Sequence, residues 1–226
     1  MRLLAIDTAA GLCAACVFDS EAQAELGRTV LELGKGHAEH VMAVIDGALG
    51  EAGLGYDALE AIAVSVGPGS FTGVRVGVAA ARGLALALGI PAIGVSTLEG
   101  LAAEARAAFP GTPVLVVLGQ RPEHLFAAAY DAGGGVLLEP VSLPVAALAE
   151  WAAKERPLLC GSAARLVAEA AGEDLKTGPA AATADIATYA GLAAAKGPGP
   201  EKPKPLYLRA PEAAPQRNFA LPRKGD

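Results

Sequence analysis

Residues 61–95 decide the fold class, and their sequence is A-I-A-V-S-V-G-P-G-S-F-T-G-V-R-V-G-V-A-A-A-R-G-L-A-L-A-L-G-I-P-A-I-G-V. Residues 61–66 form a short apolar run that predicts a strand buried on both faces. A helical pattern follows over residues 72–88 and stops at Gly89, and residues 92–95 are another apolar run. A strand, a helix and a strand in this order predict an α/β protein.

The flanking sequence continues the alternation. Three β-type runs come first, at residues 2–8, 12–19 and 24–33. A helix then begins after Gly36 and stops at Gly53, because apolar residues between them recur at helical spacing. Another helix is expected over residues 97–108. The first half of the chain therefore has the order β-β-β-α-β-α-β-α.

The second half repeats this order, although the residues themselves show no repeat. Its expected strands are 114–118, 125–130, 136–141, 158–160 and, weakly, 174–177; its expected helices are 145–154, 163–171 and 184–195. Two such halves facing each other are the layout of the actin-like (ASKHA, RNase H-like) superfamily of ATPases and sugar kinases. We therefore expect an N-terminal half over residues 1–108 and a C-terminal half over 109–226, with a Pro/Gly-rich tail from about 197.

Composition and charge limit the function classes. The 226 residues are 53% hydrophobic and carry a net charge of −6, which argues against wide phosphate-backbone binding. From Arg209 onward four basic and two acidic residues give a tail of +2, which could contact nucleic acid or be a solvated end. The longest apolar stretch, residues 83–95, contains Pro91 and is too short for a membrane span. These features predict a cytoplasmic protein with no membrane contact.

The three cysteines are expected to be small buried hydrophobes. Cys13 and Cys16 form C-x-x-C within a β-type run, where positions three apart point to opposite faces. Their thiols should diverge, which disfavours a redox or metal site. Together with Cys160 they give an odd number, which fits a reducing compartment.

The turn after the first strand is the candidate nucleotide site. In the actin-like layout Asp7 and Thr8 would sit in a phosphate loop, with Asp7 holding a metal-bound water. The alternative is that the two residues only initiate a turn. The equivalent turn of the second half, residues 118–123, has no Asp at its strand end, and residues 160–163 offer one glycine and no acid. This gap argues against a self-sufficient ATPase or kinase.

The sequence gives little support to a metal site built on histidines or to a catalytic serine. His37 and His40 lie one helical turn apart and could share a metal with a third ligand, but the only other histidine, His124, is in a distant strand. Surface or capping roles are the alternative, and no metal site is predicted. Ser70 has no histidine near it in the chain, so a hydrolase is not favoured.

The helix at 72–88 has apolar residues on nearly every side. One stripe, formed by Val74, Val78, Ala81, Ala85 and Leu88, should lie on the sheet. The neighbouring stripe of Gly73, Gly77, Ala80 and Leu84 is expected to need a second covering surface. That surface is either the other half of this chain or a partner protein, and the pattern does not decide between them.

Several motifs resemble the bacterial TsaB (YeaZ) family. They are A-I-D-T at residues 5–8, H-A-E-H at 37–40, G-P-G-S-F-T-G-V-R-V-G-V-A-A-A-R-G-L-A-L-A-L-G-I-P at 67–91, V-S-T-L-E-G-L-A at 95–102 and P-L-Y-L-R at 205–209. The match is dense up to about residue 108 and thin beyond it. The long middle motif is specific to this family.

The resemblance implies a non-catalytic, actin-like subunit of the machinery that installs threonylcarbamoyl on the adenosine next to the anticodon of certain tRNAs. It implies pairing with the catalytic TsaD-like subunit, which carries the metal-binding histidines, through two N-terminal helices. A TsaE-like ATPase in the same complex, a homodimer when the chain is alone, and ATP or ADP only at the partner interface are further expectations. The pairing surface would include His37, His40, Ser70, Phe71, Thr72, Gly73, Arg75, Val76, Gly77, Ala79 and Ala80.

The sequence departs from the family pattern in two places. The second-half turn has Gly119-Gln120-Arg121 where Asp-Ala-Arg is common, and Ala9 stands where Ser is common. Two other hypotheses stay open beside the assembly role. One is an ATP-dependent transferase of the actin-like superfamily that uses Asp7 and Thr8, and the other is a peptidase that uses Ser70.

Overall fold

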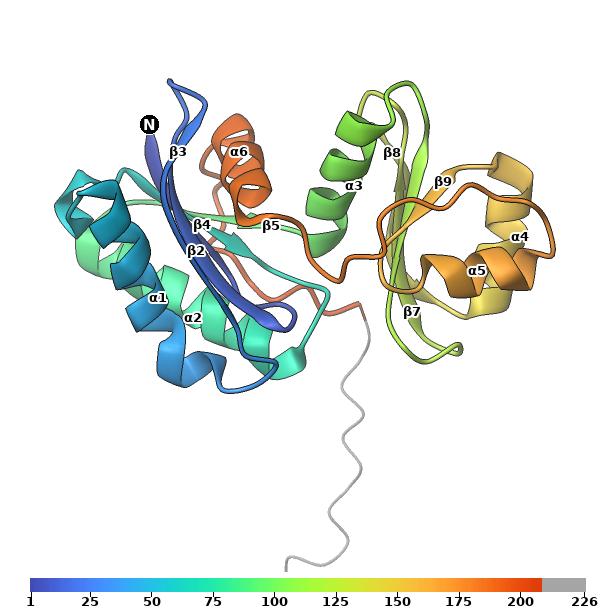
Figure 1. The fold of residues 1–226 in the computed structure, drawn as a ribbon, viewed down its shortest axis with the longest axis horizontal. Coiled ribbons are helices and arrows are strands. Elements are labelled where there is room, and N and C mark those ends of the chain that lie inside the picture. The colour runs from blue at the N-terminus through green and yellow to red at the C-terminus, as the bar shows by residue number, and fades with distance from the viewer. Residues whose placement is uncertain (209–226) are drawn as a thin grey trace, which may run out of the picture.

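The computed structural model of the chain describes residues 1–208, which form two α/β lobes (Figure 1). The first lobe contains a five-stranded sheet of order β3-β2-β1-β4-β5, built from β1 (Arg2–Asp7), β2 (Leu12–Asp19), β3 (Ala24–Glu32), β4 (Ala61–Ser65) and β5 (Ala92–Val95). The second contains a four-stranded sheet of order β8-β7-β6-β9, built from β6 (Val114–Leu118), β7 (Leu125–Tyr130), β8 (Val136–Leu143) and β9 (Leu158–Cys160).

The strand pairing is the same in the two sheets. In the first, β1 pairs antiparallel with β2 and parallel with β4, so that Ile6 lies between Ala15 and Val64. In the second, β6 pairs antiparallel with β7 and parallel with β9. The weak strand expected at residues 174–177 is reduced to one parallel bridge between Leu159 and Thr177. The predicted order is therefore confirmed in the first lobe, whereas the second lobe lacks a fifth strand.

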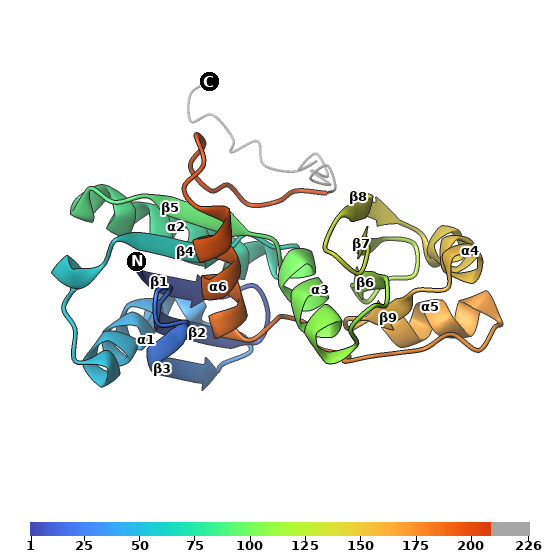
Figure 2. The same cartoon turned by 90° about the horizontal axis from the view of Figure 1, so that it is seen from above.

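The helices complete a layered arrangement. They are α1 (His37–Ala52), the short 3-10 helix η1 (Tyr56–Ala58), α2 (Phe71–Leu88), α3 (Thr97–Ala108), α4 (Val145–Glu155), α5 (Ala164–Ala171) and α6 (Ile186–Lys196). Helices α1 and α2 cover one face of the first sheet, and α4 and α5 cover the outer face of the second (Figures 1 and 2). Between the sheets lie α3 and α6.

Helices α3 and α6 exchange lobes. Helix α3 comes from the first half of the chain and packs on β6 and β7, whereas α6 comes from the second half and packs on β1 and β2. The central core cluster accordingly contains residues from both sheets and both helices. The expected boundary at residue 108 separates the strands of the two sheets, but these helices pack across it.

Helix α6 is held on the first sheet by Tyr189, whose side chain is fully buried. Gly100 of α3 makes room for this ring, because a β-carbon there would lie 2.9 Å from Cε1 of Tyr189. At the helix N-terminus Asp185 accepts a hydrogen bond from the Ala187 N–H at 2.9 Å. Arg28 of β3 donates to the same carboxylate at 2.7 and 2.8 Å, so the start of α6 is tied to the sheet.

Helix α2 begins and ends as its sequence predicts. Ser70 is the N-cap, and its hydroxyl oxygen accepts a hydrogen bond from the Gly73 N–H at 3.2 Å. Gly89 ends the helix in the left-handed conformation, with φ of 68°. The predicted stripe on the sheet is confirmed: Val74, Val78 and Ala81 are buried.

Part of the neighbouring small-residue stripe is covered by the first lobe itself, whereas Ala80 and Leu84 are half-buried. Gly73 and Gly77 are buried against Thr8, directly after β1, where the Thr8 hydroxyl donates to the Gly73 carbonyl at 2.7 Å. A β-carbon on Gly77 would lie 2.5 Å from the Thr8 hydroxyl oxygen. The helix is also not buried all round, since Phe71 is 56% and Leu86 is 76% exposed. The small residues thus allow the helix to approach its own sheet.

After α6 the chain returns to the first lobe. This returning segment, residues 197–208, donates a backbone hydrogen bond from Leu206 to the Val66 carbonyl at 2.8 Å. Pro203 is buried against Gly94 of β5. The basic residues Arg209, Arg217, Arg223 and Lys224 lie outside the described residues.

Among the described residues, helix α2 alone is long and apolar enough to cross a membrane by length and composition. Its apolar character has another explanation in this structure. Val74, Val78, Ala81 and Ala85 pack into the core between α2 and the first sheet.

Two glycines of α2 provide a matched pair for testing this packing. We expect Gly77→Ala to lower the free energy of unfolding by about 1–3 kcal/mol, because the new methyl group has no room beside Thr8. The same substitution at Gly83, which faces open space, should raise it by up to about 1 kcal/mol through helix propensity. Urea unfolding of both variants measures the difference; equal effects would contradict the assigned orientation of α2.

Candidate functional site

Asp7, at the end of β1, lies in a closed network of hydrogen bonds. Its side chain is 1% exposed. One carboxylate oxygen, Oδ1, accepts hydrogen bonds from the Ala9 N–H at 2.9 Å and from the Ser65 hydroxyl. The other, Oδ2, accepts from the Thr183 hydroxyl at 2.6 Å, and this hydroxyl is also bonded to the Tyr189 hydroxyl at 2.7 Å. The carboxylate therefore connects β1, β4 and the loop before α6.

Burial raises the pKa of Asp7 above its ordinary value, and the bonds from Ser65, Thr183 and Ala9 offset part of this rise. The turn itself is also closed. Ala9 is buried, and its carbonyl accepts a hydrogen bond from the Ser70 N–H at 2.7 Å. Asp7 and Thr8, the two residues expected to contact a nucleotide, are thus bonded within the chain, and neither is exposed.

The histidines lie apart. His37 is buried, and its Nε2 lies 3.1 Å from the Leu12 carbonyl oxygen. His40 is exposed on α1, and His124 is in the second lobe beside β7. Within residues 1–208, no three His, Cys, Asp or Glu side chains come together as a metal site. His37 therefore ties α1 to the start of β2.

The Ser70 hydroxyl is bonded within the chain, and the cysteines are buried. The Ser70 hydroxyl caps α2, and no histidine in the described part of the chain bonds to it. Cys13 and Cys16 are free, buried and in different core clusters, as expected from their positions in a strand. Burial raises the pKa of Cys13 to about 11 and that of Cys16 to about 12, which leaves both thiols protonated and weakly nucleophilic at neutral pH.

The turn after β6 is the second-lobe equivalent of the turn that contains Asp7, and it offers few groups that could bind a nucleotide. Gly119 adopts a φ of 133°, which favours glycine. Its N–H donates to the Ser162 hydroxyl at 3.4 Å, which links this turn to the loop after β9. The turn after β6 has no aspartate at its strand end, and residues 160–163 contain no acid, as the sequence indicates.

Helices α1 and α2 lie side by side on the outer side of the first lobe (Figure 1). We define this outer face by residues His40, Met42, Ala43, Phe71, Thr72, Arg75, Ala79, Arg82, Gly83 and Leu86, which are all exposed. It combines apolar and small side chains with two arginines.

The residues expected to pair with a partner divide into two groups. Exposed or half-buried are His40, Ser70, Phe71, Thr72, Arg75, Val76, Ala79 and Ala80. Buried in this chain are His37, Gly73 and Gly77, because they contact Leu12 and Thr8 instead of solvent. These three residues therefore have little exposed surface in this chain, and their part in pairing stays a prediction.

Sequence reasoning missed Tyr207, which lies beside the outer face. Its hydroxyl accepts a hydrogen bond from Nε of Arg75 at 2.8 Å, and its ring centroid is 6.1 Å from that of Phe71. The guanidinium of Arg75 lies over the Phe71 ring, 3.5 Å from its centroid. The P-L-Y-L-R motif was the only sequence signal for this contact, since the two partners are 132 positions apart.

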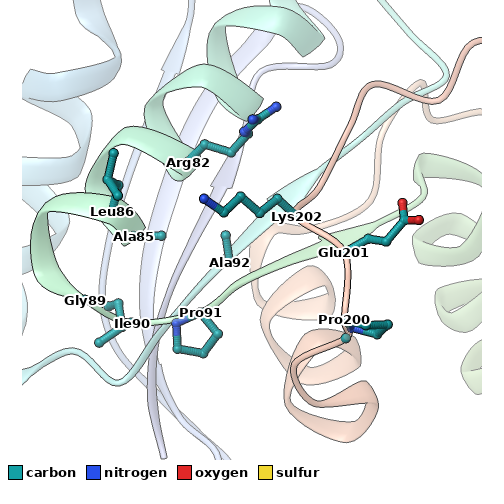
Figure 3. Close-up of a pocket in the computed structure, with 11 residues that line it drawn as sticks. Arg82, Ala85, Leu86, Gly89, Ile90, Pro91, Ala92, Pro200, Glu201 and Lys202 are labelled. Atoms are coloured by element: carbon teal, nitrogen blue, oxygen red, sulfur yellow. The ribbon is translucent and has the colours of Figure 1, made fainter.

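A pocket of about 280 Å³ lies between the C-terminal half of α2 and the returning segment (Figure 3). Arg82 and Lys202 extend toward the same region of the pocket, over Ala85, Leu86 and Ala92. Glu201 points away from them, and its carboxylate pairs with Lys204 at 2.7 Å. The pocket is therefore apolar at its base with two cations near its opening.

Comparison with known proteins agrees with this geometry. A family model described as TsaD: tRNA N6-adenosine threonylcarbamoyltransferase matches residues 31–196. The tRNA threonylcarbamoyladenosine biosynthesis protein TsaB of Escherichia coli (strain K12) is 36% identical over 132 residues, 58% of this chain and 55% of that protein. TsaB of Bacillus subtilis (strain 168) is 32% identical over 163 residues, 70% of this chain and 69% of that protein.

Among solved structures, YeaZ from Pseudomonas aeruginosa superposes with a TM-score of 0.73 at 27% identity, covering 92% of this chain and 99% of that one. The matched segments span only about half of the first curated relatives, from 40% to 55% of their lengths.

The two sheets of matching topology, with α3 and α6 between them, make this a protein of the actin-like fold, as the sequence predicted. The relatives refine that class. The chain belongs to the TsaB (YeaZ) family.

The buried carboxylate gives a pH-dependent prediction. Because the pKa of Asp7 is raised in the folded state, the folded protein binds more protons than the unfolded chain between the ordinary and the raised pKa. Raising the pH through this window should therefore lower the free energy of unfolding of the wild type. Asp7→Asn removes this loss while keeping an acceptor for Ala9 and Ser65, and the Thr183 hydroxyl can turn to donate to Tyr189.

The measurement is urea unfolding of wild type and Asp7→Asn from acidic to neutral pH. We expect the wild type to lose stability relative to the variant as the pH rises. The control is Asp57→Asn, which replaces an exposed aspartate in η1 and leaves Asp7 in place. The wild type should not lose stability relative to this control as the pH rises. A difference between wild type and Asp7→Asn that is constant with pH would contradict the raised pKa.

Proposed function

We propose that this chain is the non-catalytic assembly subunit of the machinery that makes threonylcarbamoyladenosine in tRNA. In this proposal it pairs with a TsaD-like catalytic subunit through the outer face. The observation that carries the proposal is the outer face itself: Phe71 and Leu86 remain 56% and 76% exposed on a helix whose other side is buried in the core. Large apolar side chains left exposed on the same side of one helix favour a protein interface there.

The family supports the pathway. The relatives from Escherichia coli and Bacillus subtilis are named for tRNA threonylcarbamoyladenosine biosynthesis, and the matching family model is named for the transferase. A chain similar to both the subunit and the transferase fits a subunit that shares the fold of its catalytic partner.

The site geometry supports a non-catalytic role for this subunit. The Asp7 carboxylate is bonded through both oxygens to its own chain, so a metal-bound water would have to displace Ser65 or Thr183. The second-lobe turn after β6 has no aspartate at its strand end, and residues 160–163 contain no acid. A transferase centred on Asp7 and Thr8 would predict micromolar Mg-ATP binding by the isolated chain, with turnover abolished by Asp7→Ala.

A peptidase centred on Ser70 is the weaker alternative. The Ser70 hydroxyl oxygen accepts from the Gly73 N–H, and the described residues place no base beside it. A nucleophilic serine requires such a base within hydrogen-bond distance. A serine-reactive probe should therefore leave Ser70 unlabelled.

The assembly role carries further expectations about ligands and partners. ATP or ADP would bind only at the interface with the catalytic subunit, and a TsaE-like ATPase would join the same complex. Alone, the chain would form a homodimer through the same outer face, so homodimer and heterodimer would exclude each other. Contact with tRNA would be indirect or through the basic tail, and the protein would act in the cytoplasm without a membrane.

The test is the affinity of this chain for the TsaD-like subunit of the same organism. Ala79→Glu places a carboxylate at the exposed centre of the α2 side of the outer face. Desolvating this carboxylate costs several kcal/mol, and it also lies one helical turn from Arg75 and Arg82, where it would compete with a partner for them, so we expect the Kd to rise at least 100-fold. Isothermal titration calorimetry measures it, and circular dichroism checks that the variant folds.

Ala170→Glu is the matched control, because Ala170 is also an exposed helical alanine but lies on α5 at the far end of the second lobe. We expect it to bind like the wild type. Equal binding by wild type and Ala79→Glu would show that the outer face is not the interface. No binding by the wild type at any accessible concentration would reject the assembly role.

A further inference from the structure

Arg75 is held in one orientation by groups from two distant parts of the chain. Its guanidinium carbon lies 3.5 Å from the Phe71 ring centroid and 5.5 Å from that of Tyr207. Its Nε–H donates to the Tyr207 hydroxyl at 2.8 Å. The returning segment presents Tyr207 to α2 because Leu206 is bonded to the Val66 carbonyl. The side chain is thus ordered before any partner binds.

The bond at Nε leaves the two terminal nitrogens of Arg75 available. Within residues 1–208 they make no hydrogen bond and no ion pair, and the residue is exposed. A planar guanidinium with two parallel N–H donors matches a carboxylate or phosphate in bidentate geometry. Preorganisation lowers the entropy lost when such a bond forms.

Two further cations, Arg82 and Lys202, lie near Arg75. Arg82 is seven residues after Arg75, which is about 10 Å along the axis and within 20° of the same direction. Lys202 extends into the pocket beside Arg82 (Figure 3), and neither has an ion-pair partner among the described residues. We call the strip formed by Phe71, Arg75, Arg82, Lys202 and Tyr207 the cationic seam.

We propose that the cationic seam docks an acidic segment of the catalytic subunit, with two carboxylates spaced about 10 Å apart for Arg75 and the pair of Arg82 with Lys202. This inference rests on the proposed function and adds a specificity determinant to it. Arg75 would bind its carboxylate directly, and Tyr207 is a positioning residue that acts through Arg75.

A protein carboxylate fits the seam better than an RNA backbone. Phe71, Arg75, Arg82 and Leu86 all belong to the outer face, so a surface that covers the apolar side chains also reaches the two arginines. Backbone recognition of RNA uses a wide basic surface, whereas this chain has a net charge of −6 and the seam contains three cations. Charge complementarity at the edge of an apolar contact sets partner choice and orientation.

The experiment measures the Kd between the full-length chain and the TsaD-like subunit over a series of salt concentrations. Arg75→Gln should raise the Kd at least tenfold and flatten its dependence on salt, because a charge pair is lost. Arg75→Lys should keep the salt dependence and still raise the Kd, because it loses the bidentate fork. Tyr207→Phe, which keeps the ring and removes the acceptor, should raise the Kd severalfold, with the salt dependence unchanged.

Arg165→Gln is the control, since Arg165 is an exposed helical arginine on α5 whose only ion-pair partner within residues 1–208 is Glu169, at 2.7 Å. It should change neither the Kd nor its salt dependence. Because Arg75 and Tyr207 are exposed, circular dichroism should find all variants folded.

The outcomes separate this inference from the proposed function. If Ala79→Glu abolishes pairing while Arg75→Gln leaves both the Kd and the salt dependence unchanged, the seam is not a docking site and the assembly role stands. If Arg75→Gln weakens only the homodimer or only tRNA binding, the occupant is a second copy or RNA, and the inference is wrong. If the wild type does not pair at all, the proposed function fails and this inference with it.

Discussion

The carboxylate of Asp7 is the constraint on which the first lobe and its link to the second depend. It accepts hydrogen bonds from Ala9, Ser65 and Thr183, which belong to the turn after β1, to β4 and to the loop that leads into α6. Because both oxygens are occupied and the residue is buried, removing any donor would leave an unsatisfied polar atom in the core. The carboxylate that the sequence predicted in a nucleotide loop is thus bonded to its own chain.

This network fixes the helices on both faces of the first sheet. On one face, the residue after Asp7 bonds to α2 through the Thr8 hydroxyl, and Gly73 and Gly77 permit that contact. On the other, Thr183 joins the Asp7 carboxylate to Tyr189 of α6. Since α6 follows the second lobe in the chain and packs on the first, its docking also limits how the two lobes are connected.

The same packing determines which surface remains for a partner. The glycines of α2 at positions 73 and 77 contact Thr8 of the first lobe. The opposite side of the helix therefore faces solvent, and it consists of Phe71, Arg75, Ala79 and Leu86. The returning segment then adds Tyr207 to that side and orients Arg75. The proposed assembly role rests on this division, in which polar side chains are bonded inside the lobe and apolar and cationic side chains remain on the outer face.

Local pattern in the sequence was sufficient for the fold class and for all the expected elements except the strand at residues 174–177. Periodicity and the stop signals at Gly53 and Gly89 placed the helices, and the alternation of strands and helices indicated the actin-like order. The family motifs predicted a pairing surface on α1 and α2. These features are local, since spacing, capping and strand propensity depend on neighbours within a few turns of chain.

Contacts between distant residues were decided only by the tertiary structure. No local signal distinguishes a glycine that admits a partner from one that admits Thr8, because both require only the absence of a side chain. The same holds for the exchange of α3 and α6, and for the approach of Tyr207 to Arg75 across 132 positions. Periodicity gives the direction of a side chain around its own helix, whereas the surface it meets depends on how the whole chain packs.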